Sequence, residues 1–236
     1  MSRKQIKINL RTFCFLINTN IFRYPKLKPI CITKGALVLN IPSRDLRVSQ
    51  QHRILVEGLI AMRMFGTSEV LVPAKALLSL PDVFIEEPTT SVSYHHVMLE
   101  THEIVVSEGL RSESLCHGPN ALSSIPENVL QDALDVLGID KKQLKESAVP
   151  SVRPFAQMKQ ARRLIARHRR NDVPLFEVSK MQKAAQASAT FRFSCPDKIK
   201  LTLPLGYWLT DLRYSVIARI SFSFLRPAND ILVFLM

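Results

Sequence analysis

The sequence has few features that would cross-link a small protein, direct its export or hold it in a membrane. Its 236 residues include only four cysteines, and none of them are spaced as C-x-x-C: Cys14, Cys31, Cys116 and Cys195. We therefore expect neither a zinc site nor a disulfide framework, and a reducing, cytoplasmic setting is the default. The apolar run at residues 13–17 is shorter than a signal-peptide core, and charges interrupt the apolar stretch at residues 216–236. Export and a membrane span are therefore not expected.

Acidic residues are missing from the first 34 positions, which hold eight lysines and arginines. The net charge of +12 is accordingly uneven: residues 1–34 carry +8, residues 35–150 carry −6 and residues 151–236 carry +10. The 47% of apolar residues suffices for a sizeable core. The positive charge thus belongs to two flanks of an ordinary acidic segment, and it does not by itself indicate a nucleic-acid binder.

Short alternating segments predict strands between residues 29 and 115. Apolar and polar residues alternate around Ile30, Leu46 and Ile54, and turn signals separate these segments. Residues 92–115 predict a long strand pair that turns at Ser107-Glu108-Gly109. Strands at this spacing favour an all-β sandwich, barrel or folded ribbon.

Three helices are expected along the same chain. Residues 72–80 have a proline in the first turn and another directly after the end. Farther on, Ser124-Ile-Pro-Glu127 is a capping box before an apolar face that stops at Gly138. The third helix is expected from Pro154 to about Arg170, where cations in the last turns suit the helix dipole. A helical extension therefore follows the strands.

Four phrases between residues 35 and 109 are more specific than any short motif. They are Gly35-Ala-Leu, PSRDLRVSQQHRILVEG at 42–58, EVLVPAK at 69–75 and YHHVMLETHEIVVSEG at 94–109. Together they resemble the later part of a bacterial Hint (Hedgehog/Intein) domain, the autoprocessing module of inteins and Hedgehog C-terminal regions. The resemblance implies a folded β-ribbon and self-cleavage chemistry.

Three site residues follow from this resemblance. In the family, a Thr/Ser-x-x-His motif protonates the nitrogen of the scissile amide while a Cys or Ser attacks the preceding carbonyl, which yields a thioester or ester. Ser49 and His52 match the amide-activating positions, and His102 matches the later histidine that helps to resolve the intermediate. A twisted, protonated amide loses its resonance and becomes open to attack, and histidine suits the role because its pKa lies near neutrality.

The nucleophile is where the sequence departs from the family. Residues 14–21 share Cys-Phe and Thr-x-Ile with the family's first-strand motif. That motif normally lies farther upstream of the Ser-x-x-His, and here thirteen residues of different character precede Cys14. We interpret the likeness as chance and expect the nucleophile-bearing strands to be missing. After Gly109 no cyclising asparagine follows, so splicing is not expected either.

Simpler explanations stand beside each of these motifs. An isolated Ser-x-x-His is usually a surface pair or a satisfied hydrogen bond. His95 and His96 point to opposite faces of a strand, so a metal site with Cys116 and His117 is not expected. The basic end of the last helix, residues 162–170, lacks aromatic residues and a recognition motif, and a solvated face explains it better than a specific nucleic-acid site.

The sequence thus predicts a mainly β, partial Hint-like domain at residues 28–118 with an α-helical extension at 119–176. A basic segment (1–27) and an irregular tail (177–236) flank it. We expect a self-cleaving domain at most, without cofactor or metal, that is inactive alone. Two alternatives remain: a non-catalytic binding or scaffold module that uses the basic flanks, and the C-terminal part of a split autoprocessing domain whose partner is a complementing N-terminal segment.

Overall fold

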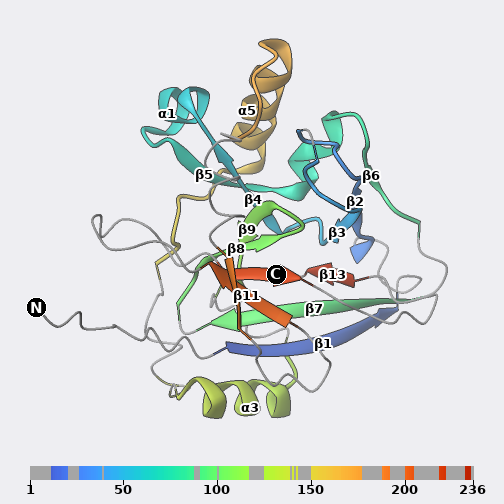
Figure 1. Cartoon of the computed structure of the whole chain (residues 1–236), viewed down its shortest axis with the longest axis vertical. Coiled ribbons are helices and arrows are strands. Elements are labelled where there is room, and N and C mark those ends of the chain that lie inside the picture. Colours follow the sequence, from blue (N-terminus) through green and yellow to red (C-terminus); the bar gives the residue numbers. More distant parts are fainter. Residues whose placement is uncertain are drawn as a thin grey trace, which may run out of the picture.

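The chain folds mainly into β-strands that form two sheets, as seen in a computed structural model (Figure 1). The structure describes residues 12–20, 27–38, 40–87, 91–99, 101–116, 125–138, 140, 142, 150–176, 188–191, 200–204, 218–221 and 232–234. The mainly β fold class with helices after it is therefore confirmed.

Each sheet mixes strands from distant parts of the chain. The six-stranded sheet runs in the order β1 (Thr12–Asn20), β7 (Ser91–Leu99), β13 (Leu232–Phe234), β3 (Leu46–Val48), β2 (Ile30–Ile32) and β6 (Val83–Ile85). The seven-stranded sheet runs in the order β10 (Ser188–Phe191), β11 (Lys200–Pro204), β12 (Ala218–Ser221), β8 (Ile104–Ser107), β9 (Leu110–Glu113), β4 (Arg53–Glu57) and β5 (Glu69–Pro73).

Two of these strands turn where the sequence predicted. β8 and β9 pair antiparallel, with Ser107 opposite Leu110, so Glu108 and Gly109 form a two-residue turn. Both have positive φ, 50° and 82°, as the tight hairpin turn that matches the strand twist requires. The expected single strand pair is nevertheless three strands, because β7 leaves for the other sheet before β8 begins.

The first expected helix differs from the structure. Residues 72 and 73 end strand β5, where Pro73 pairs with Arg53, and only η2 (Ala74–Ser79) is helical, as a 3₁₀ helix. The valine-rich run Val70-Leu71-Val72 before Pro73 extends the ladder with β4 instead of starting a helix. A short helix that the sequence did not predict, α1 (Leu59–Phe65), precedes β5 and ends at Gly66 in the left-handed conformation.

The two later helices are present with shifted starts. α3 (Glu127–Leu137) ends at Gly138, whose φ is 67°, and its N-cap is Pro126; Ser124 of the expected capping box lies outside the described residues. It lies along β1 (Figure 1). α5 (Met158–Arg170) begins four residues after Pro154 with a Gln157/Gln160 capping box.

The extended segment before α5, residues 150–157, explains its late start. Leu71 of β5 donates its N–H to the Pro154 carbonyl and accepts the Ala156 N–H, each at 2.9 Å. These residues run along β5 as an extended chain, so they cannot also form a first helical turn. α5 itself then packs on β5, η2 and α1 (Figure 1).

One main core fills the space between the sheets and α5. Strands β2 to β5 contribute β-branched side chains with no exposed surface: Ile30, Ile32, Val48, Ile54, Val56, Val70 and Val72. Leu164 and Ile165 of α5 are equally buried in the same cluster. The extension is therefore part of the same packed unit as the strands. No helix in the described part of the chain is long and apolar enough to cross a membrane.

Candidate functional site

The Ser49-x-x-His52 motif forms a tight turn between β3 and β4. The His52 N–H lies 3.1 Å from the Ser49 hydroxyl oxygen and 3.2 Å from the Ser49 carbonyl oxygen, so both oxygens accept from it. On the other side, the His52 carbonyl accepts the Ala74 N–H at 2.8 Å. The alternating run is therefore two strands joined by a turn, and serine suits its first position because a short hydroxyl can bond the nearby main chain.

The His52 ring is kept neutral at physiological pH. Its exposed fraction is 2%, and burial lowers its pKa from 6.5 to about 3, with smaller contributions from the positive charges of Arg53, His96 and His102. A positive charge on any of these three side chains disfavours protonation of His52. His102 lies near enough for its charge to lower the pKa of His52, and the assignment of both histidines to one site stays a prediction.

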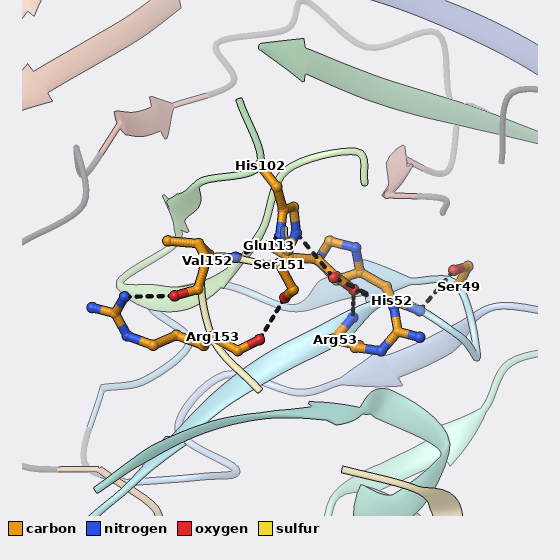
Figure 2. Close-up of polar contacts among 8 residues, drawn as sticks. All are labelled: Ser49, His52, Arg53, His102, Glu113, Ser151, Val152 and Arg153. Atoms are coloured by element: carbon orange, nitrogen blue, oxygen red, sulfur yellow. Dashed lines mark hydrogen bonds and ion pairs between the residues drawn. The ribbon is translucent and has the colours of Figure 1, made fainter. Parts of the chain in front are cut away.

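His102 is held by both of its ring nitrogens (Figure 2). Nδ1 accepts the N–H of Val152 at 3.2 Å, and Nε2 lies 3.2 Å from Oε2 of Glu113, at ion-pair distance but outside straight hydrogen-bond geometry. Neither side chain is exposed. Because Nδ1 accepts a hydrogen bond, the proton of the neutral ring sits on Nε2 and faces the carboxylate.

Glu113 links this histidine to the strand that follows His52. Its Oε1 accepts the Arg53 main-chain N–H at 2.6 Å, and the Arg53 guanidinium lies 3.4 Å from both carboxylate oxygens. Burial raises the pKa of Glu113, and this outweighs the opposing effects of His102 and Arg53. Phe155 completes the cluster: its ring lies edge-on to His102, 5.8 Å between centroids, and 3.9 Å below the Arg53 guanidinium.

Comparison with known protein families identifies the domain that contains these residues. The model of the Hint domain matches residues 14–119, which include the turn, His102 and Glu113. Residues 14–119 form a Hint domain. No curated protein and no solved structure matches the chain.

The Hint match begins at Cys14 and so includes residues 14–27, which the sequence resemblance left outside the domain. In the structure Cys14 lies in β1, opposite Val97 of β7, and the neighbouring Phe15 lies opposite His96. His96 is 2% exposed and acts on the pKa of His52. The backbone of β1 is therefore one strand away from the histidine cluster.

Sequence reasoning missed Glu113, Arg53 and Val152 of the Hint domain and its extension. Val152 and Arg53 are 50 and 60 residues from their partners His102 and Glu113 in the chain, so no local motif could reveal these contacts. One signal was available for Glu113. The two-residue turn at Glu108-Gly109 fixes the hairpin register, which places Glu113 opposite Ile104, two residues from His102.

Potential metal ligands and exposed cations also occur in the described part of the Hint domain and its extension. No three histidine, cysteine or acidic side chains there are grouped to hold a metal ion, and His117 lies outside the described residues. Along α5, the cations at 159, 162, 163, 169 and 170 are exposed. That they form a solvated face stays a prediction.

Proposed function

We propose that this Hint domain carries the machinery for autoprocessing, in which a backbone amide is rearranged to an ester or thioester and then cleaved. Ser49 and His52 activate the amide, and His102 assists resolution of the intermediate. The supporting observation is that a turn places Ser49 next to His52, while His102 belongs to the same buried cluster. The family membership of residues 14–119 agrees with this chemistry.

The turn leaves the Ser49 hydroxyl proton available for that role. The Ser49 oxygen accepts the His52 N–H, and its own proton stays free to be donated to a substrate carbonyl. With a pKa of about 3, His52 is neutral at pH 7, so it must first take up the proton that the attacking nucleophile loses and then pass it to the amide nitrogen. In the reaction the nucleophile bonds to the carbonyl carbon, the C–N bond breaks, and the nitrogen leaves as an amine that has gained a proton.

We also propose that the chain alone is inactive because it lacks the nucleophile. Between residues 14 and 49, the described strands are β1, β2 and β3. We infer that a complementing N-terminal segment supplies the nucleophile, as in a split domain.

A second candidate is that Cys14 itself is the nucleophile. Two observations favour it: the Hint match begins at this residue, and β1 pairs with the strand that carries His96. In that case the scissile bond joins Phe13 to Cys14, and cleavage releases residues 1–13.

Mass spectrometry of the purified chain, with and without a thiol, tests these proposals. We expect the wild type alone to keep its full mass. When a separate segment is added in which further residues precede a Cys-led Hint first strand, we expect the bond before that cysteine to break in the added segment. His52→Ala abolishes that cleavage. His168→Ala is the matched control, because the ring of this buried histidine of α5 contacts the Val173 and Pro174 carbonyls of the extension.

Each other result rejects a defined part of the proposal. Thiol-dependent loss of residues 1–13 from the chain alone, abolished in Cys14→Ala, overturns the missing nucleophile and establishes the second candidate. If no His52-dependent cleavage occurs under either condition, autoprocessing is rejected, and the non-catalytic scaffold function becomes the better account.

A further inference from the structure

We propose that Glu113 is the positioning residue of this site: it fixes the tautomer and orientation of His102 and holds the start of strand β4 directly after His52. Its effect on cleavage rests on the proposed function, whereas its effect on His102 does not. Glu113 touches no reacting atom and acts through the two histidine-bearing segments.

The first step is the place of Glu113 in the sheet. β4 and β9 share one ladder pair, Ile54 with Ser112, so Arg53 and Glu113 come next opposite each other. At this position the Arg53 N–H bonds to the Glu113 side chain, at 2.6 Å. The carboxylate thus replaces a main-chain partner at the point where β4 begins.

The second step is that the two carboxylate oxygens have different partners. Oε1 accepts from Arg53, and Oε2 faces Nε2 of His102 at 3.2 Å. Since Val152 donates to Nδ1, the ring can keep this arrangement only with its proton on Nε2. A carboxylate, which only accepts when ionised, matches both donors at once.

The third step is the rigidity of the support. Glu113 ends the hairpin β8–β9, and the hairpin is closed beyond it by the Ser114 N–H on the Glu103 carbonyl at 2.8 Å and the Glu103 N–H on the Ser114 hydroxyl at 2.9 Å. A buried ion pair between Arg111 and Glu57 ties the same hairpin to the far end of β4. With no exposed surface at Glu113, water cannot substitute for its carboxylate.

The test is Glu113→Gln in the full chain, read by the ¹⁵N shifts of the histidine rings. The amide keeps the size of the side chain but presents one acceptor and one donor, so either Arg53 or His102 faces a mismatched group. We expect the His102 signal to leave the Nε2–H form for a mixture that includes Nδ1–H, which breaks the contact to Val152. Glu113→Asp retains two acceptors on a shorter side chain and restores part of the Nε2–H signal.

Glu86→Gln is the matched control. Glu86 is a partly buried carboxylate that accepts two bonds from Arg47, at 2.6 and 2.8 Å, and contacts none of the histidines. This variant leaves the ring signals unchanged. In the complementation assay, Glu113→Gln slows cleavage tenfold or more and Glu86→Gln does not.

Each outcome separates the two proposals. A folded Glu113→Gln protein with an unchanged His102 signal overturns the positioning role. If the signal changes but wild-type protein never cleaves, the positioning role stands and the proposed function fails. If Glu113→Gln does not fold, Glu113→Asp is decisive: unchanged ring signals overturn the role, and a partial shift away from Nε2–H supports it.

Discussion

His52 and His102 reach the same buried cluster in opposite ways. His52 is positioned through its main chain, by Ser49 three residues earlier and Ala74 across the β4–β5 connection. His102 is positioned through its ring, by Val152 and Glu113 from two other segments. The comparison teaches that one histidine depends on a local turn, whereas the other depends on the whole fold being assembled.

Lowering the pH should have the largest effect on the free energy of unfolding, and it acts through His52. In the unfolded chain His52 titrates near 6.5 and in the folded protein near 3, so between these values the unfolded state binds more protons. The contribution to stability is complete above pH 6.5 and is lost as the pH falls towards 3, by about 5 kcal/mol in all. Chemical denaturation at pH 7, 5 and 4 should show a steep loss in the wild type and a shallower one in His52→Gln.

Ser49→Ala serves as the control for that titration, because it changes the turn and keeps the ring. Its pH dependence should follow that of the wild type. Equal slopes for wild type and His52→Gln would contradict the burial of a neutral His52.

Removing the Phe155 ring tests how far the position of His102 depends on a contact from a distant segment. Phe155→Ala loses the edge-on contact with His102 and the contact with the Arg53 guanidinium. We expect a loss of about 2 kcal/mol in the free energy of unfolding, measured with urea, and a shift of the His102 ring signals.

Val173→Ala is the matched control for Phe155, because it truncates a similarly exposed apolar side chain of the extension, 43% against 38%. It should cost less than about 0.5 kcal/mol. An equal loss in both variants would mean that the ring contacts contribute nothing beyond apolar area.

Replacing the Ser49 hydroxyl should have the smallest effect. Ser49→Ala removes one acceptor of the His52 N–H while the Ser49 carbonyl remains, so we expect a loss of about 1 kcal/mol. Ser49→Thr keeps the oxygen and should recover most of it. A loss as large as that of Phe155→Ala would show that the turn, too, depends on distant contacts.

The fold was predictable where short-range chemistry decides it. The turn at Glu108-Gly109 and the helix end at Gly138 need positive φ, which the sequence signals directly. α1 was missed because Gly58 and Gly66 both resemble turn signals, although they bracket a seven-residue helix. So short a helix depends on its contacts with α5, which no local pattern contains.

The same distinction between local signals and tertiary contacts applies to the candidate site. Ser49 and His52 are three residues apart in the sequence and in contact through the His52 N–H, and a family resemblance on residues 42–58 pointed to them. Glu113 and Val152 are placed by the sheet register and by the docking of residues 150–157, which are tertiary events. The late start of α5 has the same origin, because pairing with Leu71 prevails over the helix signal of Pro154.

The segment at residues 150–157 also decides how much of the chain must be kept together. β5 is the outer strand of its sheet, and it carries the apolar residues Val70, Leu71 and Val72. The main-chain groups of Leu71 that face outward are occupied by residues 154 and 156. A fragment cut at residue 119, where the family match ends, would leave this edge open to pairing with another molecule. Expression of the isolated match should therefore yield aggregates, whereas the full chain, which keeps residues 150–157 and strands β10 to β13, should stay in solution.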